Sequence, residues 1–186
     1  MADIKLFNIS SGAVEEIIAG SMGLERSLQR LFEANLETLL GVKVLASEYT
    51  ITDGRIDTLG IDENGCPVVI EYKRHSNENI INQGLFYLDW LMNHRDSFKI
   101  LTLDRLGKEA ADMVDWSVPR LVCIAADFNK YDESAVKQMS RNIDLIRYRL
   151  FGEDLLMLDH IATSTGSAQQ SNNLQSDGVK HSPPKS

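Results

Sequence analysis

A tight-turn signal, Asn64-Gly65, lies between two extended segments and constrains the fold more than any other feature of the chain. The segments, Arg55–Asp62 and Cys66–Lys73, are rich in apolar and β-branched residues and read as strands. Because a tight Asn-Gly turn joins neighbouring antiparallel strands, the two segments are expected to pair. This pairing brings Asp57 on the first strand towards Glu71 on the second.

The patterns on either side of this hairpin predict an α/β fold. Apolar residues recur at helical spacing over Leu24–Leu40 and Asn79–His94, and Gly41 ends the first helix. A strand over Val42–Thr50 would complete an antiparallel meander with the hairpin. The remaining expected elements are a leading hairpin that begins with a strand over Ile4–Ile9, helices near Lys108–Val114 and Glu133–Asn142, and strands over Arg120–Ala126, Leu145–Phe151 and Leu155–Ile161. The order α-β-β-β-α-β predicts a mixed central sheet flanked by helices.

Composition and length favour one soluble domain. The chain has 186 residues, of which 43% are hydrophobic. No apolar run approaches the roughly 18 residues of a membrane helix, and the N-terminus has no export signal, so we expect a cytoplasmic protein without membrane contact. Residues 1–161 are assigned to the domain. Residues 162–186 are polar and lack apolar periodicity, and we expect them to form a disordered tail.

Charge and cysteine content exclude some classes of function. The net charge of −8 argues against tight, non-specific binding of nucleic acid. It does not argue against a metal-site enzyme, because bound cations offset clustered carboxylates. The two cysteines, Cys66 and Cys123, have no partners at zinc-ligand spacing and are expected to be buried thiols.

The second strand of the hairpin ends in an acid and a base on one face. Side chains alternate along a strand, so Glu71 and Lys73 point the same way, and the turn brings Asp57 to them. Two carboxylates with the backbone carbonyl of Tyr72 make the oxygen-only ligand set that Mg²⁺ prefers. A lysine beside the metal can orient or deprotonate an attacking water. The alternative is that these three side chains form a surface ion-pair ladder.

Several motifs together resemble the PD-(D/E)xK nuclease superfamily. They are Gly54-Arg55-Ile56-Asp57, Val69-Ile70-Glu71-Tyr72-Lys73-Arg74, and Asn82-Gln83 followed by Tyr87-Leu88. Within that superfamily they are similar to the C-terminal nuclease domain of the NucS/EndoMS type, which cuts single-stranded, branched or mismatched DNA. The resemblance covers about residues 24–92. It implies a restriction-endonuclease-like core and a DNA nuclease that depends on Mg²⁺ or Mn²⁺.

The resemblance also implies roles for individual residues. Asp57 and Glu71 become metal ligands, and Lys73 acts on the attacking water. Gln83 and Tyr87 match the glutamine and tyrosine of the following helix, where they share one face and could position a water or a phosphate.

Three further residues complete the expected site. The resemblance places an acid of the first helix near the metal, and Glu25 matches best, with Glu33 as the alternative. Arg55 and Arg74 are expected to contact substrate, although Arg55 could instead pair with an acid.

Two other interpretations stay open. The chain shows no counterpart of the N-terminal DNA-binding and dimerisation domain of NucS proteins, so a catalytically silent binding module with the nuclease fold is the main alternative. A homodimer with His75 or Trp90 at the contact is the other. The basic residues of the C-terminal half lie among acids and form no strong basic cluster. Tyr148 could contact DNA at a strand edge, or it could simply lie on an edge exposed to solvent.

Overall fold

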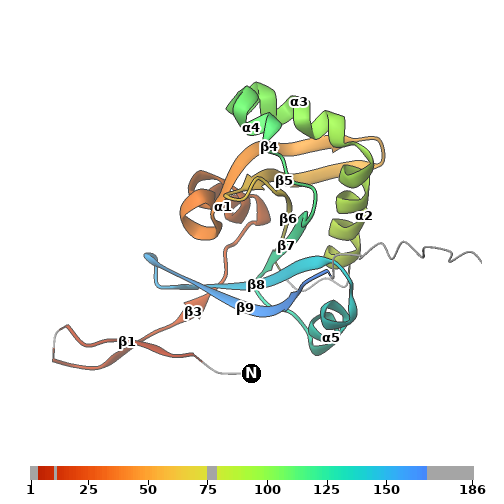
Figure 1. Cartoon of the computed structure of the whole chain (residues 1–186). Helices are drawn as coiled ribbons and strands as arrows, with labels where there is room; N and C mark the ends of the chain where they lie inside the picture. Colours follow the sequence, from red (N-terminus) through yellow and green to blue (C-terminus); the bar gives the residue numbers. More distant parts are fainter. Residues whose placement is uncertain (1–3, 11, 75–78, 167–186) are drawn as a thin grey trace, which may run out of the picture.

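One mixed sheet of seven strands organises the molecule (Figure 1). The computed structural model describes residues 4–10, 12–74 and 79–166. The strands of the large sheet are β3 (Ala19–Gly20), β4 (Val42–Ile51), β5 (Gly54–Asp62), β6 (Pro67–Lys73), β7 (Arg120–Ala125), β8 (Asn142–Phe151) and β9 (Leu155–Ser164). Their order is β3-β8-β7-β6-β5-β4, with β9 paired to β8. A separate antiparallel hairpin of β1 (Leu6–Asn8) and β2 (Glu15–Ile17) precedes the sheet, as expected.

The sheet changes from antiparallel to parallel at β6. β4, β5 and β6 form the predicted meander, whereas β6, β7 and β8 run parallel. The parallel connections cross over through helices, as parallel pairing requires. These helices are α2 (Ile80–Asn93), α3 (Arg95–Leu106), α4 (Lys108–Asp112) and α5 (Lys130–Gln138). The predicted α/β class with a mixed central sheet between helices is confirmed.

Two apolar layers hold the helices to the sheet. On one face, α1 (Glu25–Leu40) packs Leu28 and Phe32 against Ile70 and Tyr72 of β6. On the other face, α2, α3 and α5 cover residues that include Val69. Alternate residues of β6 therefore enter opposite layers, as expected for a strand buried on both faces. Because β6 is central, its C-terminal end is anchored from both sides.

Several predicted elements differ from those observed. β9 continues to Ser164, which pairs with Ile143, so the sheet includes residues assigned to the tail. Residues 167–186 lie outside the described part of the chain. Helix α5 begins at Lys130 rather than near residue 133, because Asn129 and Asp132 form a reciprocal capping box. Helix α3 was not predicted. Within the described residues, no helix is long and apolar enough to cross a membrane.

Candidate active site

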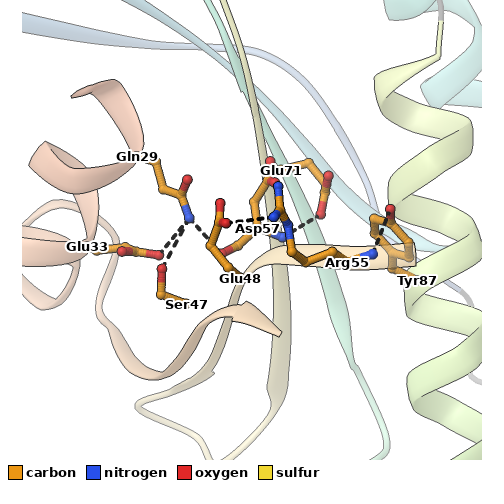
Figure 2. A network of polar contacts seen from close by, with 8 residues as sticks. All are labelled: Gln29, Glu33, Ser47, Glu48, Arg55, Asp57, Glu71 and Tyr87. Atoms are coloured by element: carbon orange, nitrogen blue, oxygen red, sulfur yellow. Dashed lines mark hydrogen bonds and ion pairs between the residues drawn. The ribbon is translucent and has the colours of Figure 1, made fainter. Parts of the chain in front are cut away.

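Strands β5 and β6 separate at the point where the two predicted acids lie. The last backbone pair between them is Thr58 with Ile70. Beyond it, Asp57 Oδ2 accepts a hydrogen bond of 3.1 Å from the Tyr72 backbone nitrogen. Glu71 Oε1 in turn accepts one of 3.2 Å from the Asp57 nitrogen (Figure 2). At this point the side-chain carboxylates, rather than backbone carbonyls, accept the hydrogen bonds between the two strands. These bonds hold Asp57 and Glu71 next to each other.

Burial makes this pair of carboxylates costly to ionise. Glu71 is fully buried, and its Oε2 atom has no hydrogen-bond partner among the described residues. Burial, followed by the charge of Asp57, raises the pKa of Glu71 to about 9. Burial also raises the pKa of Asp57, despite the hydrogen bond from Tyr72. A cation at this position would favour both charged forms.

The donor set is suited to a hard cation. The N–H and C=O of one residue point to the same side of a strand. Since the Tyr72 N–H meets the Asp57 side chain, its carbonyl faces the same gap between β5 and β6. Over the described ranges, no group of three acidic, histidine or cysteine side chains is placed to share one ion. The oxygens available for a small divalent cation are therefore two carboxylates and a carbonyl, with water for the rest.

Lys73 is next to the carboxylates but is bound to Glu25. Its Nζ lies 3.2 Å from Glu25 Oε1, and Glu25 Oε2 accepts a hydrogen bond from the Arg74 backbone nitrogen. Burial disfavours the ammonium, but the bond to Glu25 and the nearby acids outweigh it and raise the pKa of Lys73. Glu25, at the start of α1, is thus the helix acid that reaches this edge of the sheet.

The alternative acid, Glu33, belongs to a hydrogen-bond network between α1 and the strands beside the site. Gln29 Nε2 donates to Glu33 Oε1, to Ser47 Oγ and, at 2.8 Å, to the backbone carbonyl of Asp57. Glu33 also accepts a hydrogen bond from Thr58 Oγ1. Gln29 is 6% exposed and was not singled out in the sequence, because nothing local marks it as buried. This network holds the backbone of Asp57 against α1.

Gln83 and Tyr87 approach β5 from the other face. Gln83 Nε2 donates a hydrogen bond of 3.0 Å to Tyr87 Oη, which also accepts a longer one, 3.4 Å, from the Arg55 nitrogen. The phenol ring packs over Gly54, where an added Cβ would lie 2.8 Å from Tyr87 Cε1 and Oη. The glycine of the Gly-Arg-Ile-Asp motif is therefore required by packing against Tyr87.

Gly54→Ala should displace Tyr87 from β5. We expect a loss of about 1–3 kcal/mol in the free energy of unfolding, because the added Cβ would overlap the buried ring of Tyr87. Gly23→Ala is the matched control, since nothing lies within 4 Å of a Cβ there. Chemical denaturation of the two variants measures the difference, and equal stability would contradict the assigned packing.

Arg55 is paired with an acid that the sequence did not single out. Its Nη1 lies 2.9 Å from Glu48 Oε2. Glu48 has a φ of 53° and is the one non-glycine residue of the described chain with positive φ, which costs roughly 1–2 kcal/mol. It stands opposite Asp57 in the β4–β5 register, between the pairs Ser47–Thr58 and Tyr49–Ile56. The register that creates this pairing is set by the two-residue turn Thr52-Asp53, between the paired residues Ile51 and Gly54.

Other residues considered in the sequence lie away from this site. Tyr148 is 1% exposed within the apolar layer beneath α1, so neither a DNA contact nor a solvated edge is correct. Arg147 is equally buried and pairs with Asp127 and Asp159. Trp90 stacks on His94 of its own chain, and His75 lies outside the described residues.

Known proteins share the sequence of this region. The family model of the endonuclease NucS C-terminal domain matches residues 24–117. An uncharacterised Haemophilus influenzae protein is 32% identical over 164 residues, which cover 87% of this chain and 54% of that protein. Endonuclease NucS of Pseudarthrobacter chlorophenolicus is 37% identical over 70 residues, 37% of this chain and 30% of that enzyme. The chain spans about half, or less, of the length of the curated relatives it matches.

Two solved structures are similar at lower identity. A complex of EndoMS with double-stranded DNA has a TM-score of 0.47 and 19% identity, and the match covers 69% of this chain and 46% of that one. A repair endonuclease from Pyrococcus abyssi has a TM-score of 0.45 and 18% identity, over 69% of this chain and 49% of that one.

Proposed function

The chain belongs to the family of NucS C-terminal endonuclease domains, and we propose from this that it is a metal-dependent nuclease that hydrolyses DNA phosphodiester bonds. The observation that supports the proposal most strongly is the pair Asp57 and Glu71 at the separation of β5 and β6. A fully buried carboxylate without a partner is destabilising unless a proton or a cation neutralises it, and a cation bound there would do so. The family and the electrostatics of the pair therefore favour the same chemistry.

Each residue of the site takes a definite role in this proposal. Asp57, Glu71 and the Tyr72 carbonyl would hold Mg²⁺ or Mn²⁺. The cation supplies charge stabilisation at the phosphate and activation of a water. Lys73 is protonated and lies beside the two carboxylates, in an ion pair with Glu25. From this position its ammonium would orient the attacking water or the phosphate.

The residues around this centre position it and the DNA. Gln83 and Tyr87 fix the start of β5. Arg55 and Arg74 would contact the DNA backbone. With a net charge of −8, the protein gains little from general phosphate neutralisation, so we expect transient binding of DNA.

One observation favours a catalytically silent module instead. Lys73 Nζ is bound to Glu25 rather than to either carboxylate of the pair. A nuclease fold that retained this ion pair as a structural contact would bind a partner without cutting it. Metal binding separates the two functions, since a silent module has no need of the cation.

Cleavage of a DNA panel tests the proposal. Labelled single-stranded, duplex, flapped and mismatched DNAs are incubated with the full chain and Mg²⁺ or Mn²⁺. We expect metal-dependent product with the parent, none with Asp57→Asn, and parent rates with Asp104→Asn, an exposed acid on α3. Equal cleavage by Asp57→Asn would assign the activity to a contaminant. No product on any DNA, together with no heat of Mn²⁺ binding, would favour the silent module.

A further inference from the structure

Glu48 holds an unfavourable conformation beside the candidate metal site (Figure 2). It is the residue with left-handed φ in the middle of β4, a strand in which any L-residue prefers negative φ. Its neighbours in the ladder pair regularly with Thr58 and Ile56, so the conformation is confined to the position opposite Asp57. Strain of this kind persists only where the surroundings impose it, and it concentrates at functional sites.

The charge at this position is also unfavourable without a cation. Glu48 stands opposite Asp57 in the β4–β5 register. Like charges directly opposite each other on paired strands destabilise a sheet. The Arg55 side chain offsets Glu48, but it is 57% exposed, and an exposed ion pair is weak.

A second, independent observation concerns the inner side of the cluster. Glu71 is 0% exposed, and its Oε2 has no partner within the described residues. The nearest ammonium, that of Lys73, is bound to Glu25. When all are ionised, the four carboxylates of the cluster outnumber its two cations by two. One divalent ion would neutralise this difference. The cluster consists of Glu25, Glu48, Asp57, Glu71, Lys73 and Arg55.

We propose that Glu48 is a third carboxylate of the metal site, which strengthens cation binding from outside the direct ligands, and that Arg55 balances its charge until the cation binds. This inference rests on the proposed function. We assign Glu48 an outer position because, as the described chain is arranged, no three acidic side chains are placed to share one ion. Outer residues of this kind tune metal affinity through charge and orientation.

Calorimetric titration of Mn²⁺ into full-chain variants without DNA tests the role of Glu48. We expect Glu48→Gln to raise the Kd for Mn²⁺ about tenfold. Arg55→Gln should lower the Kd by about two- to fivefold, because it removes a repelling cation. Glu37→Gln, which breaks the exposed Glu37–Lys43 ion pair elsewhere on the surface, should match the parent. Glu48→Asn, a residue that tolerates left-handed φ, repeats the test if the glutamine variant folds poorly.

The inference requires that the two substitutions change the Kd for Mn²⁺ in opposite directions. If Glu48 serves only to hold Arg55, the two substitutions remove the same contact and change the Kd alike, which would overturn the inference. A Kd for Glu48→Gln equal to that of the parent would also overturn it, while leaving the proposed function intact. If the parent itself binds no Mn²⁺, the proposed function and the inference fail together.

Discussion

Lys73→Met is expected to reduce DNA cleavage by at least about 100-fold while Mn²⁺ binds no more weakly than to the parent. The ammonium is not among the oxygen donors of the candidate site, so its loss leaves Asp57 and Glu71 in place. It also removes a positive charge near the cation, which cannot weaken metal binding. The methionine retains the length and the apolar stem of the lysine. Cleavage is measured under single-turnover conditions at saturating Mn²⁺, and binding by calorimetry.

A matched control isolates the chemistry of Lys73 from its ion pair. Lys43→Met removes an exposed lysine whose Nζ lies 3.9 Å from Glu37 Oε1, and it should cleave at the parent rate. Glu25→Gln breaks the Lys73–Glu25 pair and leaves the ammonium present. If Lys73 acts in catalysis, Lys73→Met loses far more activity than Glu25→Gln. Equal and small losses would mean that Lys73 serves only as the partner of Glu25.

The meeting of Asp57 and Glu71 could be predicted because local signals determine it. The connection is a three-residue loop, Glu63-Asn64-Gly65, in which Gly65 has a φ of 82°, and this loop sets the register that brings the two side chains together. The roles of Gln29 and Glu48 depend on tertiary structure. Gln29 is buried only because α1 crosses β4 and β5, and the left-handed φ of Glu48 has no glycine or asparagine to announce it.

Helix α3 was missed because its sequence pattern is misleading. Ile100 and Leu103 are exposed, while the buried positions are Phe98 and Thr102. The Thr102 hydroxyl donates to the Phe98 carbonyl, which satisfies a polar group inside the apolar layer. Apolar periodicity therefore does not follow the buried face, and the periodicity on which helix prediction relies is absent.

Glu71→Gln is expected to stabilise the metal-free protein and to abolish its binding of Mn²⁺. The pKa of Glu71 is raised from 4.5 to about 9, so at pH 7 the folded state holds a proton that the unfolded state has released. Taking up that proton costs on the order of 3 kcal/mol of stability at pH 7. A neutral glutamine has no such cost, and its carbonyl oxygen can still accept the bond from the Asp57 nitrogen.

The effect of Glu71 on the stability of the metal-free protein depends on pH. Because the pKa is raised on folding, the contribution of Glu71 is fully favourable below about pH 4.5 and is lost as the pH rises towards 9. Urea unfolding of the metal-free parent should therefore show stability falling over that range, with a shallower fall for Glu71→Gln. Saturating Mn²⁺ should raise the stability of the parent and leave that of Glu71→Gln unchanged. A parent that gains nothing from Mn²⁺, or a variant less stable than the parent at pH 8 without metal, would contradict the view that this fully buried carboxylate is retained to bind a cation.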